Sequence, residues 1–395
     1  MQIMKSRNHE IKSHDAIQEE RKKKGVSLPS DLKCVARRQQ KEREREREGD
    51  VVDGRADAFE IHLSWSRAWV IVMLGFEFME SLVSSDFGAL VGKTMLAFVV
   101  VLYGMETLGF LYRTFLRPGQ NLKKKYGGWA VVTGCTDGIG KAFCEELARQ
   151  NIPVLLISRT ESKLKDLQEL LLKTSKKDDY QVKYVVCDFA NATEKKWKEV
   201  KAEVESLDVG MLFNNVGVSY PHAQYVHELD EDIISQLISV NIVTTTKMTK
   251  MVLPGMIERN GGAIVNIGSG AATVLPSDPL YSIYAGAKGY VDQFSKSLSV
   301  EYRKYNIDVQ IQAPLFVVSK MSKIRRASIT VPTPRAYAKA GLASIGYETR
   351  VSPYWSHSLI WAFIASLPES MMDGIRLGMT TKIRKRALAK KSKKA

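Results

Sequence analysis

Residues 129–140, which read WAVVTGCTDGIG, decide the fold of this chain. An apolar run of strand length at 129–133 leads into a turn with three glycines, and an amphipathic stretch of helical length follows at 139–150. Glycines in such a turn let the backbone approach a pyrophosphate, which the free N–H groups and positive dipole end of the helix attract. The pattern predicts a dinucleotide site, rather than a merely structural turn, at Gly134, Thr136, Asp137, Gly138, Ile139 and Gly140.

Outward from this turn, short apolar runs alternate with amphipathic stretches. The runs of strand length are 129–133, 154–158, 182–187, 211–214, 263–268 and 308–313, and the helical stretches are 139–150, 162–174, 193–207, 231–253 and 281–305. Continuous apolar strands that are separated by helices form a parallel sheet with both faces covered and with right-handed crossovers. We predict an α/β fold, a doubly wound parallel sheet of the Rossmann type, in an NADP-binding domain at 119–350.

The end of the second strand selects the form of the dinucleotide. A carboxylate there would accept the ribose hydroxyl of NAD, but this chain has Arg159, with Lys163 one helical turn beyond. Cations favour a 2′-phosphate, so NADPH is the predicted cofactor; the alternative is that both are ordinary surface residues beside a helix. Asp188, at the end of the third strand, could accept a hydrogen bond from the adenine amino group or could cap the next helix.

Four polar residues farther along the chain indicate chemistry on a carbonyl group. Tyr284 and Lys288 share one helix face, and an ammonium beside a phenol favours the phenolate and lowers its pKa towards neutrality. Ser269 follows the fifth strand, at the sheet edge where ligands bind, and could hydrogen-bond a substrate carbonyl. Asn241 could hold a water that re-protonates the pair. The alternatives are a helix-capping or turn serine at 269 and a buried amide at 241 that bonds to the backbone.

Composition argues against several other classes of protein. Of 395 residues, 45% are apolar and 26% are charged, as in ordinary globular proteins. Four cysteines without a CxxC pair and six scattered histidines indicate neither a disulfide scaffold nor a metal site. The formal charge of +15 is largely terminal, with eight basic and no acidic residues at 379–395, so we expect no nucleic-acid partner.

Three further segments flank the predicted domain. Residues 1–57 are poor in large apolar side chains, and we expect a disordered charged tail. Residues 58–118 should be membrane-associated: 68–83 is too short and too charged to span, whereas 94–116 is the expected transmembrane helix, with a buried core helix as the alternative. Basic residues after this helix place the domain in the cytosol. Residues 351–395 combine an apolar segment, also too short to span, with a basic tail.

The complete set of motifs resembles the short-chain dehydrogenase/reductase family. It comprises, in chain order, the glycine turn, Asn214-Asn215-Val216-Gly217, Asn241, Ser269, Tyr284 and Lys288. The stretches 116–118, 281–294 and 320–328 are similar, more narrowly, to the membrane-bound very-long-chain 3-oxoacyl-CoA reductases, especially the plant type. The narrower likeness covers about residues 89–395.

The resemblance implies an activity and the residues that perform it. Tyr284 would donate a proton, Lys288 would lower its pKa, Ser269 would orient the carbonyl and Asn241 would complete the proton relay. NADPH would be held by the glycine turn, Arg159, Lys163, Asp188, Asn215, Tyr284, Lys288 and the segment after Pro314, including Val317 and Ser319. Lys288 would donate to the ribose of the cofactor. The reaction would reduce a long-chain 3-oxoacyl-CoA to a 3-hydroxyacyl-CoA in fatty-acid elongation at the endoplasmic reticulum membrane. Its partners would be the other elongase enzymes: a condensing enzyme, a dehydratase and an enoyl reductase. Lys391 and Lys393 resemble a retrieval signal for that membrane.

Some positions depart from the family pattern. Val216 stands where alanine is usual, and Leu315 follows Pro314 where glycine is usual, a replacement that the narrower group shares. Fifteen residues separate Ser269 from Tyr284, a longer spacing than is common, so Ser277 and Ser282 are fallback candidates. Two other functions stay open: a 17β-type ketosteroid reductase of the same family, and a membrane subunit that binds NADP(H) without turnover.

Overall fold

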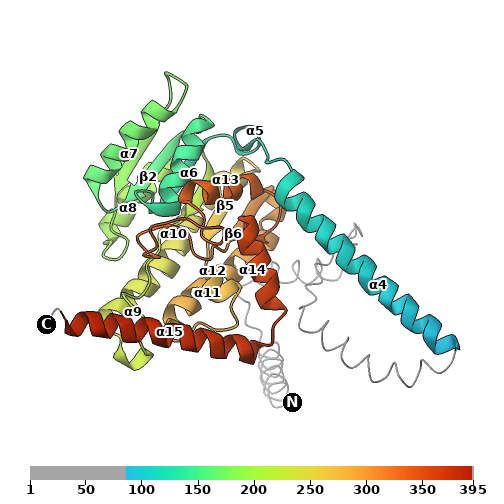
Figure 1. Cartoon of the computed structure of the whole chain (residues 1–395). Helices are drawn as coiled ribbons and strands as arrows, with labels where there is room; N and C mark the ends of the chain where they lie inside the picture. The colour runs from blue at the N-terminus through green and yellow to red at the C-terminus, as the bar shows by residue number, and fades with distance from the viewer. Residues whose placement is uncertain (1–85, 394–395) are drawn as a thin grey trace, which may run out of the picture. The chain divides into compact units, whose positions relative to one another are not determined.

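The computed structural model describes residues 86–393, whose central feature is a parallel sheet between two layers of helices (Figure 1). The predictions for 1–57 and 68–83 fall outside the described residues. Seven strands follow the order β3-β2-β1-β4-β5-β6-β7, and every neighbouring pair is parallel. The strand order reverses between β1 and β4, which is where open sheets of this kind bind ligands. The predicted α/β fold, a doubly wound parallel sheet, is confirmed.

Six of the strands coincide with the predicted apolar runs to within two residues. They are β1 Trp129–Thr133, β2 Val154–Ser158, β3 Val182–Val186, β4 Val209–Asn214, β5 Gly262–Ile267 and β6 Ile307–Gln312. The sequence analysis missed β7, Arg350–Val351. Two residues are too few to leave a recognisable pattern, and β7 exists because it pairs with the end of β6.

The five predicted helical stretches are also present. Four become single helices: α6 Gly138–Arg149, α7 Glu161–Thr174, α8 Glu194–Glu205 and α12 Ser282–Glu301. The fifth is interrupted by a turn of π-helix, so that it consists of α9 Glu231–Ile238, η3 Ser239–Val243 and α10 Thr244–Glu258. Such widened turns are frequent at functional sites, and this one contains Asn241.

Several helices were not predicted. They are α13 Pro334–Ser344, α15 Glu369–Ser392, α5 Leu122–Tyr126, η2 Val226–Glu228 and α11 Gly270–Thr273. The apolar segment expected after residue 351 forms α14 Trp355–Ala365, and the end of the predicted stretch 281–305 forms η4 Arg303–Tyr305. The basic tail expected at the C-terminus is helical up to residue 392, and α15 buries Met372 and Thr380.

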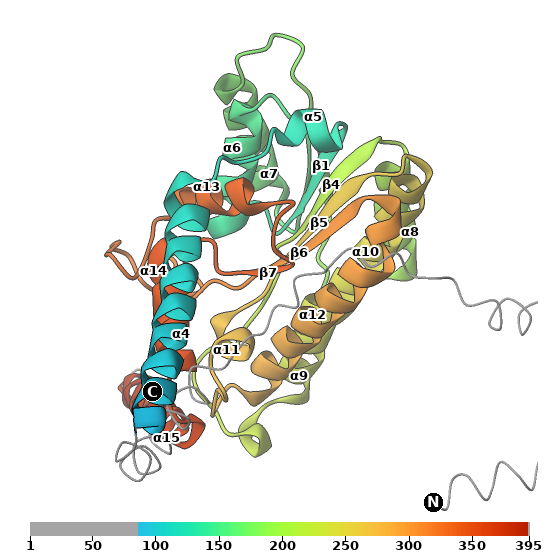
Figure 2. The same cartoon turned by 90° about the vertical axis from the view of Figure 1, so that its right-hand side faces the viewer.

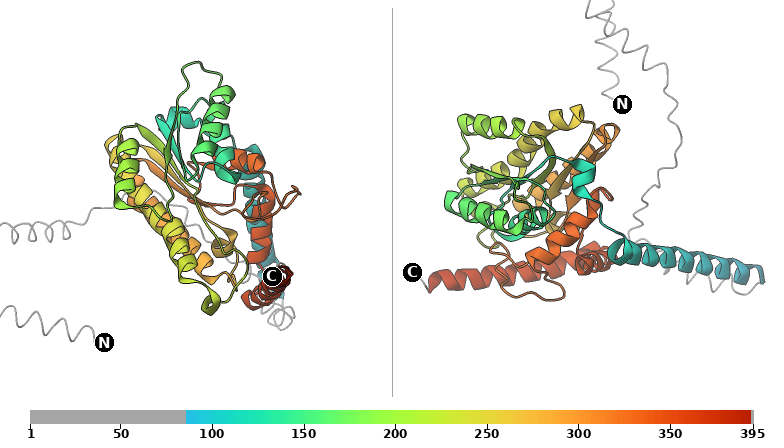
Figure 3. Two further views of the ribbon diagram at one scale, coloured as in Figure 1. Left: turned by 90° about the vertical axis from the view of Figure 1, so that its left-hand side faces the viewer. Right: turned by 90° about the horizontal axis from the view of Figure 1, so that it is seen from above.

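Two apolar clusters cover the two faces of the sheet. One contains buried side chains of α6, α7 and α13, and the other contains those of α8, α10 and α12. Figure 2 shows the same two sets of helices on opposite sides of the strands, and Figure 3 shows the three layers from other directions. β1, β2, β4 and β5 are buried on both faces, which is why their sequences are continuous apolar runs. The core therefore fixes the ends of the strands, including those of β4 and β5, which precede the candidate site residues Asn215 and Ser269.

The predicted transmembrane segment forms α4 Asp86–Leu111 and continues as the π-helix η1 Tyr112–Leu116. Among the described residues, Leu90–Leu116 is the one helix that is long and apolar enough to cross a membrane, with 27 residues and a mean hydropathy of 1.8. None of its apolar window is buried within the chain. The alternative of a buried core helix is therefore wrong.

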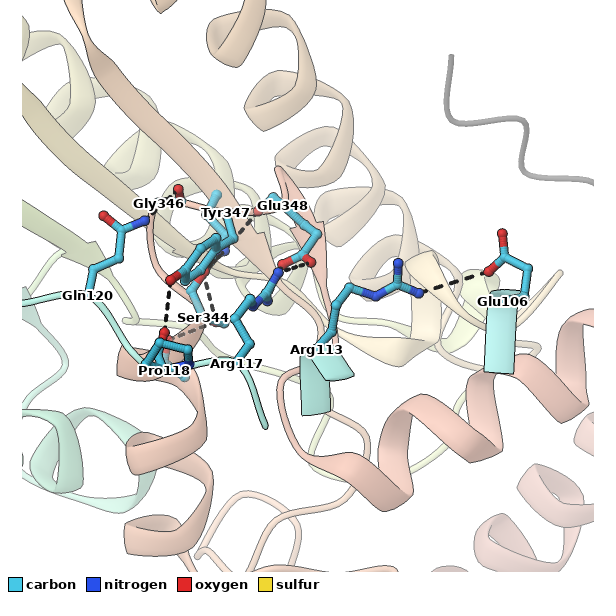
Figure 4. A network of polar contacts seen from close by, with 11 residues as sticks. Glu106, Arg113, Arg117, Pro118, Gln120, Ser344, Gly346, Tyr347 and Glu348 are labelled. Atoms are coloured by element: carbon cyan, nitrogen blue, oxygen red, sulfur yellow. Dashed lines mark hydrogen bonds and ion pairs between the residues drawn. The ribbon is translucent and has the colours of Figure 1, made fainter. Parts of the chain in front are cut away.

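A polar junction joins this helix to the rest of the chain (Figure 4). Arg117 donates two hydrogen bonds to the Glu348 carboxylate, at 2.6 and 2.8 Å, and its guanidinium lies 3.9 Å from the centre of the Tyr347 ring. The Tyr347 hydroxyl donates to the carbonyl of Pro118, and Gln120 donates to that of Gly346. Hydrogen bonding with Glu348 raises the pKa of Arg117. The junction therefore holds the end of η1 to the loop before β7.

Candidate functional site

Two glycines of the turn between β1 and α6, Gly134 and Gly140, leave no room for a Cβ atom. Gly134 has a φ of +63°, which favours glycine. A Cβ atom on Gly140 would lie 2.3 Å from the Asn215 amide nitrogen and 2.6 Å from the Gly134 carbonyl oxygen. Any larger residue at 140 would therefore displace the turn. A glycine at this position agrees with the predicted pyrophosphate site.

Asn215, the residue after β4, fixes the shape of this turn from the neighbouring strand. Its side-chain amide donates to the carbonyls of Thr133 and Gly134, both at 3.0 Å. The buried Thr133 hydroxyl accepts from the backbone N–H groups of Asn215 and Val216, each at 3.1 Å. Thr133 thus holds two adjacent loops together, a role that the sequence analysis missed because a strand-end threonine carries no distinctive pattern.

The segment after β6 meets the same turn. Asp137 caps α6 by accepting from the Gly138 N–H at 2.8 Å, and its other oxygen lies 3.2 Å from the ammonium of Lys320. A Cβ on Gly138 would lie 3.5 Å from Ser319 Cβ. Two residues earlier, Val317 is buried in the core cluster of α6, and Ile139 packs against that cluster. The structure therefore brings the residues predicted at the turn close to those predicted after Pro314.

The residues predicted to select the cofactor lie at the ends of β2 and β3. Arg159 and Lys163 are exposed, and neither has an acidic partner among the described residues. Thr136, in the glycine turn, shares a 3.0 Å hydrogen bond with Ser158, immediately before Arg159. Cations without carboxylate partners at this place fit a phosphate ligand.

Asp188 does not cap the next helix, so that alternative is wrong. The cap of α8 is Thr193, whose side chain accepts from the Lys196 N–H. Asp188 instead accepts from the Ala190 N–H at 3.3 Å and from the Asn191 amide at 3.0 Å, within its own turn. Its place after β3 stays compatible with the predicted adenine contact.

Ser269 and Tyr284 act on each other across the carboxyl end of β5. The Ser269 hydroxyl caps α11 by accepting from the Ala271 N–H at 3.2 Å, so the predicted alternative of a capping serine is correct as well. Burial raises the pKa of Tyr284, hydrogen bonding with Ser269 lowers it, and the charge of Asp278 raises it. The phenol is therefore protonated at neutral pH.

Lys288 and Asn241 lie beside Gly217. A Cβ on Gly217 would stand 2.9 Å from the Asn241 side-chain oxygen and 3.4 Å from the Lys288 ammonium nitrogen. The amide of Asn241 is fully bonded to backbone: it donates to Val218 and Leu237 and accepts from the Val218 N–H at 3.2 Å. The alternative of a buried amide bonded to backbone is thus observed at 241.

The ammonium of Lys288 is directed to the backbone. It donates to the Ile267 carbonyl at 2.8 Å, and burial lowers the pKa of Lys288 to about 8. Burial is the largest influence on the pKa of Tyr284 in this arrangement. That the Lys288 ammonium lowers the pKa of the phenol stays a prediction.

Comparison with known proteins decides the family. Residues 128–329 match the family described as short chain dehydrogenase. This chain belongs to the short-chain dehydrogenase family. A very-long-chain 3-oxoacyl-CoA reductase-like protein of Arabidopsis thaliana is 42% identical over 289 residues, 71% of this chain and 88% of that protein. The very-long-chain 3-oxoacyl-CoA reductase of Homo sapiens is 40% identical over 271 residues, 68% of this chain and 84% of that protein.

Other relatives limit what likeness alone can show. The inactive hydroxysteroid dehydrogenase-like protein 1 of Homo sapiens is 39% identical over 271 residues, 68% of this chain and 80% of that protein. A solved 7β-hydroxysteroid dehydrogenase has a TM-score of 0.56 at 22% identity, and the match covers 65% of this chain and 99% of that one. That structure establishes a shared fold alone. Because an inactive relative is about as similar as a reductase, activity has to be argued from the site residues.

Neither fallback serine of this short-chain dehydrogenase acts on the phenol. Ser277 donates to the Asp373 carboxylate on α15, and Ser282 is an exposed first residue of α12. Ser269 alone of the three shifts the pKa of Tyr284. The long spacing between Ser269 and Tyr284 is explained by α11 and the loop after it, which lie between the two residues.

The replacement of the family's usual glycine by Leu315 has a structural counterpart. A Cβ on Gly270 would lie 2.3 Å from a Leu315 methyl carbon, so the leucine occupies space that Gly270 leaves open. The Leu315 N–H donates to the buried imidazole of His357 on α14, at 3.4 Å, and the other ring nitrogen lies 3.2 Å from the Thr330 carbonyl oxygen. In this short-chain dehydrogenase, α14 therefore anchors the loop that follows β6.

Proposed function

We propose that this short-chain dehydrogenase reduces 3-oxoacyl-CoA to 3-hydroxyacyl-CoA with NADPH in very-long-chain fatty-acid elongation. The observation that carries the proposal is the grouping of Ser269, Tyr284, Lys288 and Asn241 at the carboxyl edge of the sheet, beside the glycine turn. The relatives named very-long-chain 3-oxoacyl-CoA reductase support the substrate class.

The residues present fit a dinucleotide with a 2′-phosphate. Gly134 and Gly140 hold the turn tightly against Asn215 and Val216 at the N-terminus of α6, where a pyrophosphate would approach. Arg159 and Lys163 offer cations without acidic partners among the described residues. Asp188, Asn215, Val317 and Ser319 complete the proposed binding set. Bound NADPH would supply the hydride for the 3-oxo carbon.

In the proposed reaction, the protein provides the proton and the orientation. Tyr284, protonated at neutral pH, would donate its hydroxyl proton to the oxygen on which negative charge develops. Ser269 would donate a hydrogen bond to the same oxygen and hold the carbonyl in place. Lys288, a cation below about pH 8, would stabilise the phenolate that remains.

Asn241 has a proposed place in the proton relay because of its position. Its side-chain oxygen and the Lys288 ammonium both border Gly217, so a water near that glycine could reach the pair from this side. The backbone bonds of Asn241 fix the π-helical turn η3 beside it.

Substrate assays test the proposal and its rivals. Membranes that contain the chain should oxidise NADPH when they receive 3-oxoacyl-CoAs of graded length, and the Tyr284→Phe variant should not. The same membranes receive a 17-ketosteroid in a parallel assay. Faster turnover of the ketosteroid would establish the 17β-type alternative, and no turnover of either ketone would establish a subunit without activity.

We also propose that the chain is anchored in the endoplasmic reticulum membrane with its catalytic domain in the cytosol. The exposed apolar helix Leu90–Leu116 supports anchoring, and the basic residues that follow it support the orientation. A protease added to intact microsomes should remove a C-terminal tag. Protection of that tag would contradict the orientation.

The proposed partners are the other enzymes of elongation: the condensing enzyme, the dehydratase and the enoyl reductase. Their requirement follows from the chemistry, because the 3-oxoacyl-CoA must be made by condensation and the 3-hydroxyacyl-CoA must lose water. Crosslinking in microsomes followed by recovery of the tagged chain should capture at least one of them, and its absence would contradict the complex.

A further inference from the structure

Helix α15 lies beyond the segment that matches the family, yet it contacts two loops next to the site. Arg376 donates from Nε to Asp278 Oδ1 at 2.6 Å, and Asp373 accepts from Ser277. Two turns farther along the helix, Arg384 makes two hydrogen bonds of 2.5 Å to Glu228. The helix is therefore held both to the loop before α12 and to η2.

The Arg376–Asp278 pair is buried at the start of the helix that carries Tyr284. The exposed fractions of the two side chains are 12% for Arg376 and 3% for Asp278. The carbonyl of Asp278 accepts from the Tyr281 N–H at 3.1 Å, immediately before α12. A buried carboxylate needs such a partner, because removing it from water is costly.

The charge of this carboxylate acts on three tyrosines. The Tyr220 and Tyr281 rings lie 5.3 Å apart, and the Tyr220 hydroxyl accepts from the Ile283 N–H at 3.0 Å. The charge of Asp278 raises the pKa values of Tyr220, Tyr281 and Tyr284, in each case as a smaller effect than burial. Burial raises the pKa of Asp278 itself, and Arg376 lowers it.

We propose that Arg376 is a positioning residue for the reduction: it holds Asp278 at the start of α12 and compensates the charge of that carboxylate beside Tyr284. The inference rests on the proposed function. The titratable or charged groups that face this region come from α12, its preceding loop, the 217–228 segment and α15, and they are Tyr284, Asp278, Tyr281, Tyr220, Arg376 and Asp373.

The sign of the charge effect gives the test its direction. Without Arg376, the negative charge of Asp278 is uncompensated and favours the protonated form of Tyr284. The alkaline limb of kcat/KM, which in the proposed mechanism reports Tyr284 and Lys288 together, should move up by about half to one pH unit in Arg376→Gln. Asp278→Asn leaves the arginine uncompensated and should move the limb down by a similar amount. The double variant should return it near to that of the unchanged chain.

Arg384→Gln is the matched control, because it removes a similar arginine–carboxylate pair from the same helix. It should leave the limb in place. Thermal stability is measured for every variant. An unchanged limb in both single variants, or a shift of both in the same direction, would overturn the proposal and leave α15 a purely structural helix.

A second readout separates this inference from the proposed function. Ultraviolet difference titration of each variant against the same variant with Tyr284→Phe reports ionisation of that phenol without any substrate. Opposite shifts in this titration support the charge role even if 3-oxoacyl-CoA is not turned over. Turnover with no such shifts refutes the role of Arg376 while the function stands.

Discussion

Two arginines outside the family-matched segment make similar contacts in very different surroundings. Arg117 pairs with Glu348 at 2.6 Å, with exposed fractions of 14% and 21%, and Arg376 pairs with Asp278 at 2.6 Å, with 12% and 3%. The first pair lies at the exit of the apolar helix (Figure 4), whereas the second lies at the start of α12.

The difference is in what each carboxylate faces. Glu348 belongs to a junction with Tyr347 and the Pro118 carbonyl, and none of the proposed reacting groups takes part in it. Asp278 acts on Tyr284 through its charge. An arginine–carboxylate pair can therefore serve attachment in one place and the electrostatics of a site in another, and only the neighbours of the pair distinguish the two.

The largest expected effect comes from Tyr284→Phe, which removes the hydroxyl that is proposed to donate the proton and on which the charge of Asp278 acts. Loss of a general acid should lower kcat by about 10²- to 10⁴-fold. NADPH binding, followed by its fluorescence, should be retained because the glycine turn is untouched. A variant that keeps more than about a tenth of normal turnover would contradict the role of Tyr284.

Lys288 adds a pH dependence that an arginine could not provide. Burial lowers its pKa to about 8, from an ordinary value of 10.5, so the cation is present below pH 8 and is lost above it. The kcat/KM of reduction should be level below about pH 8 and should fall about tenfold per pH unit above it. Steady-state rates across pH 6 to about 10 test this, and an alkaline limb near the ordinary lysine value would show that Lys288 is not the group concerned.

A third arginine extends the comparison, because Arg159 has no carboxylate partner among the described residues. If it receives a 2′-phosphate, Arg159→Asp should raise the KM for NADPH by about 10-fold or more, from the loss of a charge-assisted contact. The KM for NADH should change much less. Unchanged selectivity between the two cofactors would contradict the phosphate contact, and Lys195→Asp, on an exposed part of α8, serves as a control for charge reversal.

Local patterns predicted most of the fold because the strands that build the sheet are buried on both faces. Runs such as 154–158 are continuous and apolar for that reason. The glycine turn was recognisable because a side chain at 140 would collide with Asn215. The ends of the chain were harder. β7 has two residues, and α15 combines charges and exposed apolar side chains that resemble a solvated tail, so only its contacts with Asp278 and Glu228 show that it packs.

The sequence predicted which residues form the candidate site but not how their surroundings shift their pKa values. Ser269, Tyr284 and Lys288 could be found because their types and order are distinctive. The effect of burial on the pKa of Tyr284, and the contribution of Asp278, depend on residues that are distant in sequence or ordinary in type. The roles of Gly217 and Thr133 could not be predicted either, because they depend on residues from other elements. Gly217 lies beside Asn241 and Lys288, and Thr133 accepts a hydrogen bond from Asn215.

The smallest expected effect on activity comes from Arg117→Gln, which tests the other half of the comparison. The change removes a bidentate pair and a contact with the Tyr347 ring, and it leaves Glu348 without its partner, so it should destabilise the chain by about 1–2 kcal/mol. The midpoint of thermal inactivation in detergent should fall by about 3–6 °C. The alkaline limb of kcat/KM should stay in place, since no reacting group faces this pair. Lys201→Gln is the control, because the ion pair of Lys201 with Glu205 on α8 is long, at 3.6 Å, and exposed, and its loss should change neither quantity. A shifted limb in Arg117→Gln would mean that the junction, too, influences the site, and the distinction between attachment and electrostatics would then fail.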